Sequence, residues 1–321
     1  MDANIQTNDW LANEMKPRIS YFGQFGILIG LVGVGIVLAT LIQVVFLLSM
    51  GCTLNDILSA NENKMMAVMA KPENFVKATI LQTLNTLILM AIPAFVLARI
   101  ITKNAFEYLE FNIKINYKQI LLTIAIAVSA IVLSLSLTEL NKYLPYPHTW
   151  RMKAEKMEET YLQSVLIFAN IKTIADFLLS ILMIAILPAI FEELLFRATL
   201  QKILINWIKN PHIAILIASI LFSLVHISIY GFLARMLLGM VLGYLFYYGK
   251  SIWLNILMHF INNALGVTSI YLTMKNGGDA KSNMNETLPI WVLPFALIIT
   301  IILLLYYKKI SEKKQLNNVV I

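Results

Sequence analysis

Residues 178–198 read LLSILMIAILPAIFEELLFRA, an apolar stretch that ends in two adjacent glutamates and an arginine. A run of this length and composition is typical of a transmembrane helix, which needs about 20 predominantly apolar residues. Glu192, Glu193 and Arg197 nevertheless lie inside it. Ionisable groups at membrane depth are costly and usually face a protein interior or a water-filled cavity, so the stretch indicates both a membrane protein and a functional site.

The composition of the whole chain supports a membrane protein. Of its 321 residues, 59% are hydrophobic and 13% are charged, whereas soluble domains carry roughly 25% charged residues. The net charge of +7 does not indicate a nucleic-acid partner, because the Lys and Arg residues flank the apolar runs, as expected for the cytoplasmic side of a membrane protein. No basic run interleaved with aromatic residues is present. The single cysteine, Cys52, excludes a disulfide within the chain and a cysteine-based metal site.

The apolar runs predict an all-α polytopic membrane protein with about eight transmembrane helices. The first run follows a polar stretch of about twenty residues and is too long for a signal peptide, so we interpret it as a retained anchor. Both termini are expected in the cytoplasm, because that arrangement places the basic connections and the basic C-terminal tail inside. The eight expected spans are approximately 21–50, 78–102, 119–138, 172–208, 212–229, 232–249, 251–273 and 288–307.

Helix geometry predicts that the polar groups of three spans approach one another. If Asn210-Pro211 forms the turn between two antiparallel helices, Glu192 and His226 both lie roughly 24–27 Å from that turn, at the same depth. His259 lies only about 12 Å from the expected start of its helix near Ser251, so that helix must begin further out or tilt to share the site.

Spacing along each helix predicts which side chains face one another. Adjacent residues point about 100° apart, so Glu192 and Glu193 cannot both face one pocket squarely. Glu193 and Arg197 are spaced i,i+4 with the acid first, which favours an ion pair and leaves Glu192 as the freer carboxylate.

Two further i,i+4 pairs carry the remaining polar groups. His259 and Asn263 share one helix face. The ring of Phe222 is expected to pack beside His226 and fix its rotamer. Separately, the small residues in Gly239-x-x-x-Gly243 predict close packing of two helices.

This set of residues suits hydrolysis by an activated water. A carboxylate in an apolar pocket binds protons more tightly than in water, which makes it a competent general base near neutral pH. A neighbouring histidine can share the attacking water or protonate the leaving amine. An imidazole N–H and an asparagine NH₂ group on one face are what an oxyanion hole requires. No serine or cysteine is obviously paired with these groups.

A metal site is the competing chemistry. Glu192, His226 and His259 together match a catalytic zinc shell with one open position. The His-Glu-x-x-His spacing of helical zinc sites is absent, however, and the three ligands would come from separate helices. We therefore expect no cofactor, with a divalent metal such as zinc as the alternative.

Three ordered motifs resemble those of a known family. Glu192-Glu193-x-x-x-Arg197, Phe222-x-x-x-His226 and His259-x-x-x-Asn263, together with the segment 239–253, resemble the CAAX-protease and bacteriocin-processing (CPBP or Abi) intramembrane endopeptidases. The resemblance covers about residues 185–270. It implies an eight-helix, CAAX-protease-like bundle with a cavity that faces the cytoplasm.

The resemblance also implies a role for each motif residue. Glu192 and His226 would activate the water, and His259 with Asn263 would hold the oxyanion. Glu193, Arg197 and Phe222 would support them. The substrate would be a peptide or a membrane protein within the lipid bilayer of the cell membrane.

The chain accordingly divides into five expected parts. They are a polar cytoplasmic N-terminus (1–20), transmembrane helices 1–3 (21–140), an extracytoplasmic loop (141–171), a catalytic helical core (172–273), and a last transmembrane helix with a basic cytoplasmic tail (274–321). Two other functions remain open. A non-catalytic membrane scaffold or bacteriocin-immunity protein could keep the same fold. A proton-coupled transporter could use the carboxylate and histidines as a relay, but only one proline-broken segment is visible and no second half mirrors it.

Overall fold

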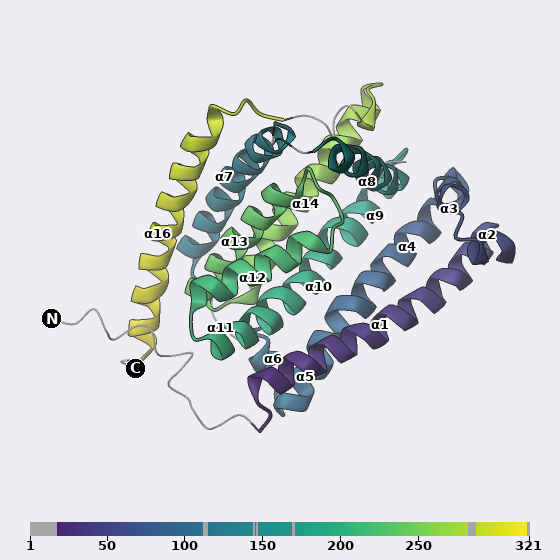
Figure 1. Cartoon of the computed structure of the whole chain (residues 1–321). Helices are drawn as coiled ribbons and strands as arrows, with labels where there is room; N and C mark the ends of the chain where they lie inside the picture. The colour runs from purple at the N-terminus through teal and green to yellow at the C-terminus, as the bar shows by residue number, and fades with distance from the viewer. Residues whose placement is uncertain are drawn as a thin grey trace.

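The computed structural model describes residues 18–111, 115–143, 145, 147–168, 171–281 and 287–319. Within these ranges the regular elements are helices and no strand occurs (Figure 1). The main helices are α1 (Tyr21–Met50), α2 (Leu54–Leu58), α3 (Glu62–Met69), α4 (Phe75–Thr86), α5 (Ile92–Ile101), α6 (Ala105–Tyr108), α7 (Tyr117–Lys142), α8 (His148–Ile167), α9 (Ile174–Ser180), α10 (Leu187–Leu195), α11 (Lys202–Ile208), α12 (Pro211–Leu224), α13 (Phe232–Gly249), α14 (Ile252–Lys275) and α16 (Val292–Val319).

Six continuous helical segments among the described residues are long and apolar enough to cross a membrane. They are Tyr21–Met50, Pro72–Ile101, Tyr117–Leu140, Ile174–Ile208, Phe232–Gly249 and Val292–Lys313. The predicted count of eight is therefore not confirmed. Helix α12 is apolar but has only 14 residues, and α14 is not among the six. The apolar character of α14 is interrupted by polar residues at Asn255, His259, Asn262 and Asn263.

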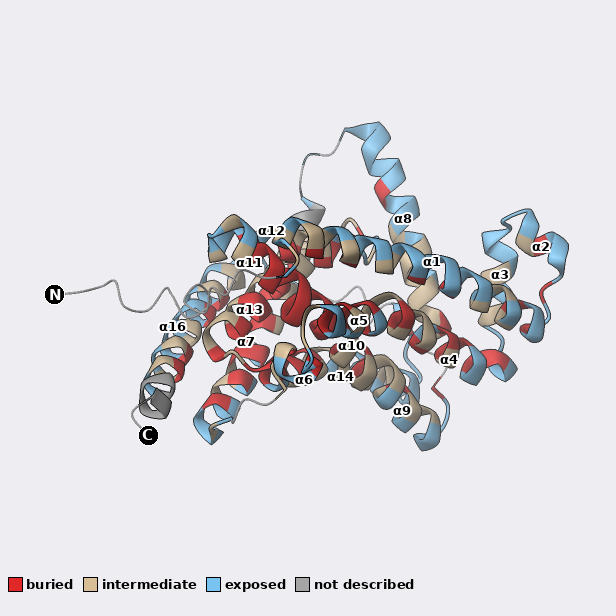
Figure 2. Cartoon of the chain, turned by 90° about the horizontal axis from the view of Figure 1, so that it is seen from below, coloured by how far each residue is buried: buried red, intermediate tan, exposed pale blue. Residues whose placement is uncertain are grey.

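The helices form a bundle whose centre is built by α10 to α14. Helices α7 and α16 pack together along one flank, and α1 and α4 lie along the other (Figure 1). Buried residues gather in the central helices, whereas α8, α2 and the outer faces of α1 and α16 are largely exposed (Figure 2). The bundle centre, which includes α10, is therefore the part of the molecule that is most enclosed by protein.

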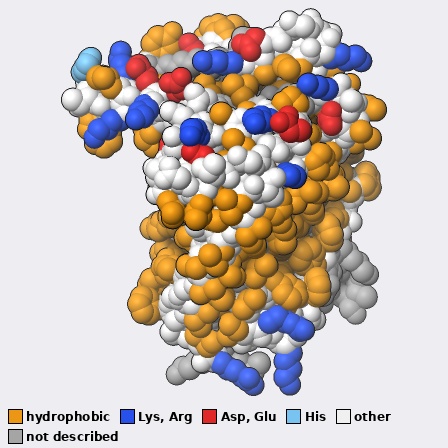
Figure 3. Space-filling view, turned by 90° about the vertical axis from the view of Figure 1, so that its right-hand side faces the viewer, with side chains coloured by type: hydrophobic (Ala, Val, Ile, Leu, Met, Phe, Trp, Pro, Cys, Tyr) orange, Lys and Arg blue, Asp and Glu red, His pale blue; other side chains and the backbone are white. Residues whose placement is uncertain are grey.

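The surface carries an apolar band between two polar ends. Figure 3 shows hydrophobic side chains across this face, with mixed charges at one end and Lys and Arg at the other. Two basic side chains lie over aromatic rings near helix ends. Lys209 lies over the ring of Tyr21 at the start of α1, and Lys308 lies over the ring of Tyr248 near the end of α13. An apolar band of this kind is what a bilayer requires. The cytoplasmic position of the basic end stays a prediction.

Prolines explain two widened turns in the long helices. The π-helical turns η2 (Leu87–Ala91) and η3 (Ile181–Ile186) end just before Pro93 and Pro188. A proline lacks the N–H of the helical ladder, and its ring clashes with the carbonyl four residues earlier, which here lies inside the widened turn. The third π-helical turn, η4 (Phe196–Gln201), contains no proline and begins three residues after Glu193. Such turns are frequent at functional sites.

The predicted extracytoplasmic loop 141–171 is partly helical. Helix α8 occupies His148–Ile167 within it. The sequence of His148–Ile167 explains the difference, because these residues include no glycine or proline and are rich in the helix formers Glu, Lys, Met and Leu. Its position on the outer side of the membrane stays a prediction.

The small-residue pattern of α13 lets this helix approach its neighbours closely. A Cβ atom added at Gly243 would lie 2.7 Å from the Ile215 side chain and 3.0 Å from that of Gln201. One added at Gly239 would lie 3.1 Å from the Cβ of Ser219. The predicted close packing through Gly239 and Gly243 is thus confirmed, and it joins α13 to α12.

Gly243→Ala is expected to destabilise the protein by about 1–3 kcal/mol, because an added methyl group has no room between α13 and α12. Gly33→Ala is the matched control, since a Cβ there meets no atom within 4 Å. Unfolding of the purified protein in detergent measures both. Equal stability of the two variants would contradict the packing described for α13.

Candidate active site

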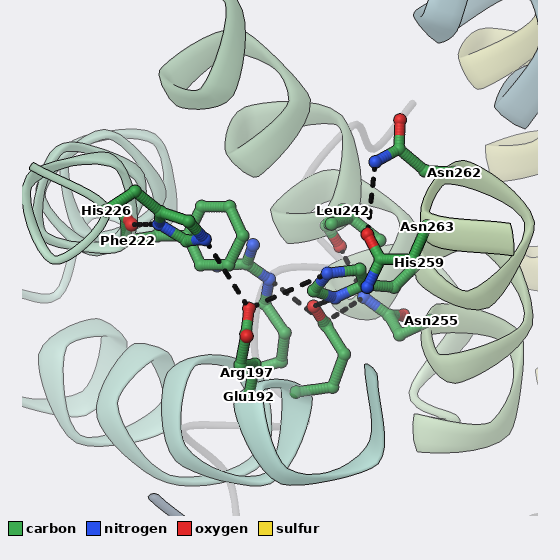
Figure 4. Close-up of polar contacts among 10 residues, drawn as sticks. Glu192, Arg197, Phe222, His226, Leu242, Asn255, His259, Asn262 and Asn263 are labelled. Atoms are coloured by element: carbon green, nitrogen blue, oxygen red, sulfur yellow. Dashed lines mark hydrogen bonds and ion pairs between the residues drawn. The ribbon is translucent and has the colours of Figure 1, made fainter. Parts of the chain in front are cut away.

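The predicted polar residues meet in the centre of the bundle (Figure 4). Glu192 and Glu193 come from α10, Arg197 from the adjoining turn η4, His226 from the loop after α12, and His259 from α14. All three motifs therefore contribute to one place, although they lie on three separate helical segments. The depth comparison required a displaced or tilted α14, and its start is displaced: Ile252 N–H donates to the carbonyl of Glu110, whose carboxylate pairs with Lys202. His259 therefore lies at the level of Glu192.

Glu193 and Arg197 form an ion pair enclosed by protein. Arg197 Nε lies 3.2 Å from Glu193 Oε2, and neither side chain is exposed. The guanidinium group also lies over the ring of Phe222, 5.0 Å from its centroid. The i,i+4 pairing expected from the sequence is thus present. Pairing is what makes burial of these charges tolerable, because an unpaired buried ion would be strongly destabilising.

Glu193 also holds His259, a contact that the sequence analysis did not predict. His259 Nδ1 lies 2.9 Å from Glu193 Oε1. The second oxygen, Oε2, accepts a hydrogen bond of 3.1 Å from Asn255 Nδ2. Glu193 is therefore the centre of a network that joins Arg197, His259 and Asn255 across α10, η4 and α14.

Glu192 faces both imidazole rings. Its Oε2 atom lies 4.0 Å from His226 Nε2 and 3.6 Å from His259 Nε2. Both distances exceed those of direct hydrogen bonds. Among the described residues, Glu192 Oε2 is a buried oxygen without a hydrogen-bond partner. A buried carboxylate oxygen that protein donors leave unsatisfied is suited to accept a proton from a small molecule held between it and the rings.

The partners of the Nδ1 atoms determine how the rings present their Nε2 atoms. His226 Nδ1 lies 2.8 Å from the carbonyl oxygen of Phe222. A carbonyl only accepts, so this nitrogen carries a proton. The same reasoning assigns a proton to His259 Nδ1, which faces the carboxylate of Glu193. In each ring Nε2 is consequently an acceptor when the ring is neutral and a donor only when the ring is protonated.

Phe222 packs among the charged groups of the site. Its ring centroid lies 5.1 Å from that of His226 and 5.8 Å from that of His259. The expected contact with His226 is present, and the Phe222 ring also meets the Phe196 ring edge to face. Phe222 therefore limits the rotation of both histidines.

Asn263 lies one turn beyond His259 on α14. Its amide oxygen accepts a hydrogen bond of 3.3 Å from Asn262 Nδ2. This bond engages the oxygen of Asn263 rather than its NH₂ group. The arrangement is compatible with the predicted oxyanion role, which needs the NH₂ protons of Asn263, and the role itself stays a prediction.

The loop that carries His226 is held by contacts from α8. Ile227 adopts a positive φ of 51°, a conformation that is strained for a β-branched residue. Glu158 Oε2 accepts hydrogen bonds from the Ser228 hydroxyl at 2.9 Å and from the Tyr230 backbone N–H at 3.4 Å. Strained backbone persists only where surrounding contacts fix it, and Glu158 supplies such contacts two residues from His226.

Arg235 lies close to the same helix. Its Nη1 atom donates to the Tyr161 hydroxyl at 3.2 Å, and its guanidinium lies 4.9 Å from that ring's centroid. Arg235 therefore contacts α8.

Glu158→Ala is expected to accelerate hydrogen–deuterium exchange of the amides in 226–231 by roughly tenfold, because a hydrogen bond to a charged group is lost. Glu155→Ala, an exposed position on the same helix, is expected to leave exchange unchanged. Mass spectrometry of the protein in detergent measures both variants. Unaltered exchange in Glu158→Ala would show that α8 does not hold the loop.

Metal binding was the competing prediction for Glu192, His226 and His259. Among the described residues, no group of three or more His, Cys, Asp or Glu side chains is arranged to hold a metal ion. The expectation of a metal-free reaction stays a prediction.

The fold and this cluster together define a multi-pass membrane protein of the kind that encloses an acid–imidazole site within its helices. Residues 174–265 match the family model described as type II CAAX prenyl endopeptidase Rce1-like. This segment extends from α9 into α14, includes all three motifs, and amounts to less than a third of the chain. The match confirms the resemblance to the CPBP family of CAAX proteases. No curated protein and no solved structure matches the chain.

Proposed function

We propose that this protein is an intramembrane endopeptidase that hydrolyses a peptide bond with a water activated by Glu192 and His226. The observation that carries the proposal is the unsatisfied Oε2 atom of Glu192, which faces the Nε2 atoms of two histidines inside an apolar bundle. The family match supports a protease with a peptide substrate in the bilayer. It does not assign a role to any residue.

The first step uses two acceptors on one water. A water between Glu192 Oε2 and neutral His226 Nε2 can donate one proton to each, which leaves an oxygen lone pair for attack on the peptide carbonyl. As the C–O bond forms, the water proton passes to Glu192. The Phe222 carbonyl keeps His226 in the tautomer that this step needs.

The second step needs donors for the oxyanion. His259 carries a proton on Nδ1 toward Glu193, so it donates from Nε2 as an imidazolium. With His259 protonated, the charges of Glu192, Glu193, Arg197 and His259 sum to zero, which is the balance that an apolar environment favours. Nε2 of His259 and the NH₂ group of Asn263 then stabilise the tetrahedral oxyanion. Collapse breaks the C–N bond, and Glu192 returns its proton to the leaving amine.

Loss of processing in cells tests this proposal. Membrane fractions of a strain that carries Glu192→Gln are expected to accumulate a precursor that the wild-type strain converts to shorter products. Quantitative proteomics of both fractions measures this. A strain with unchanged membrane peptides, at equal protein level, would instead favour a non-catalytic scaffold with the same fold.

Chelation tests the metal-free form of the mechanism. Incubation of the purified protein with 1,10-phenanthroline is expected to leave the cleavage rate within about twofold of the untreated rate, since water activation is assigned to Glu192 and His226 alone. A rate that falls and is restored by added zinc would replace this mechanism with a metal-dependent one.

A further inference from the structure

We propose that Asn255 is a positioning residue of this site: its amide group holds Glu193 in the orientation that presents His259 to Glu192. Asn255 is fully buried and lies one helical turn before His259, on the same face of α14. The kinetic consequence rests on the function proposed above, whereas the structural consequence does not depend on it.

Both amide protons of Asn255 are directed to oxygen atoms. Nδ2 donates to Glu193 Oε2 at 3.1 Å and to the Leu242 carbonyl of α13 at 2.8 Å. If the amide were turned over, its own oxygen would face a carboxylate and a carbonyl, neither of which donates when Glu193 is ionised. The amide oxygen is instead a buried atom without a hydrogen-bond partner among the described residues. The orientation of Asn255 is thus decided by its two donated bonds.

These bonds restrict which oxygen of Glu193 meets His259. Oε2 accepts from Asn255 and lies 3.2 Å from Arg197 Nε, so two groups hold it. Oε1 remains for His259 Nδ1 at 2.9 Å. Rotation of the carboxylate would break three contacts together. Because Nδ1 of His259 is held in this way, its Nε2 atom is fixed toward Glu192.

Asn255 also joins three helices at the site. Its side chain extends from α14, its carbonyl partner Leu242 belongs to α13, and Glu193 belongs to α10. The relative placement of α10 and α14 determines whether the acid and the imidazole meet. A polar bond between these helices is a direct means of fixing that placement, because a polar group inside a membrane bundle finds its partners on neighbouring helices.

The structural test is the state of the His259 ring in Asn255→Leu, an apolar replacement of similar size. The chain has only four histidines, so ¹⁵N-histidine NMR of the protein in detergent resolves them, and His259→Gln assigns the signal. The ring nitrogen shifts of His259 are expected to change in Asn255→Leu and to stay unchanged in Asn206→Leu. Asn206 is the control because its amide donates within its own helix, to the Lys202 carbonyl. Identical His259 signals in Asn255→Leu and wild type would overturn the proposal.

The kinetic test separates positioning from general destabilisation. Asn255→Leu is expected to lower kcat roughly tenfold, with KM within about twofold, because one hydrogen bond to a charged group is lost. If Asn255 acts through Glu193, the double variant with Glu193→Gln loses no more activity than Glu193→Gln alone. Losses that multiply would overturn the proposal. If Asn255→Leu is not recovered folded, Asn255→Ser, which keeps one donor, replaces it. A smaller loss of kcat is then expected, and no loss would contradict the positioning role.

Glu192→Gln in the same assay identifies which claim fails. If Glu192→Gln retains the wild-type rate, the proposed activation of water by Glu192 is wrong, and if the wild-type protein itself cleaves no peptide, the proposed function is wrong. If Glu192→Gln is inactive while Asn255→Leu has the wild-type kcat, only the role of Asn255 is wrong.

Discussion

Glutamine in place of Glu192 is expected to lower kcat/KM for peptide hydrolysis by about a thousandfold. General acid–base catalysis contributes roughly 10²–10⁴-fold, and glutamine keeps the shape of glutamate but cannot accept the proton of the attacking water. The measurement is cleavage of the accumulated precursor by purified protein in liposomes. Binding of that precursor is expected to be nearly unchanged, because the substitution removes only the acceptor.

Glu73→Gln is the matched control for this prediction. Glu73 is the exposed middle residue of the short helical turn Pro72–Asn74 and is not part of the central cluster. Its amide variant is expected to cleave at the wild-type rate. Equal cleavage by Glu192→Gln and Glu73→Gln would remove Glu192 from the mechanism.

Arg197→Met is expected to destabilise the protein by about 3–5 kcal/mol. Removal of one partner from a buried ion pair leaves the other charge uncompensated, and neither side chain of the Glu193–Arg197 pair is exposed. The change also removes the group that covers the face of Phe222. Denaturant unfolding of the purified protein in detergent measures the loss.

A second i,i+4 pair provides the comparison for Arg197. Lys308 and Glu312 are 3.7 Å apart, and their side chains are 43% and 33% exposed. Solvent-accessible pairs contribute about 0–1 kcal/mol, so Lys308→Met is expected to have little effect. Similar destabilisation by Arg197→Met and Lys308→Met would contradict the structural role of the buried pair.

Much of the helical arrangement could be predicted from the sequence, because long apolar runs have few alternatives in a bilayer. Helices α1 and α13 have the bounds expected from their runs, 21–50 and 232–249. The start of α12 was also predictable, since Asn210 caps the helix and Pro211 is its first residue. The number of spans could not be predicted from the apolar runs alone, because α12 is short and α14 is rich in polar residues.

The pairings within one helix could be predicted for the site, whereas those between helices could not. The spacing of Glu193 and Arg197 determines their contact. The bond between Glu193 and His259 depends on how α10 and α14 are rotated relative to each other, which the spacing in either helix leaves undetermined. The role of Asn255 was missed for the same reason. Its position four residues before His259 was the available signal, because it places a buried amide on the same helix face.

Depth along the membrane was the least reliable expectation. Counting from the helix start near Ser251 placed His259 much closer to the cytoplasmic helix ends than Glu192. The Nε2 atom of His259 nevertheless lies 3.6 Å from Oε2 of Glu192. Such counting assumes that α14 starts at the same depth as the Asn210-Pro211 turn. In the structure the backbone N–H of Ile252 donates to the Glu110 carbonyl, and Lys202 pairs with the Glu110 carboxylate, so α14 starts at the level of Lys202. From there Glu192 lies ten residues from Lys202 and His259 lies eight from Ser251, which is roughly 12–15 Å in both helices.

The central claim is that Glu192 and His226 act on one water as a single unit. The most direct measurement compares cleavage rates of Glu192→Gln, His226→Ala and the double variant, each purified and assayed on the same precursor in liposomes. Residues that act as a unit show strongly non-additive losses, so the double variant is predicted to be no slower than the slower single variant, within about threefold. A double variant whose loss equals the product of the two single losses would show that the two side chains act independently and would contradict the account.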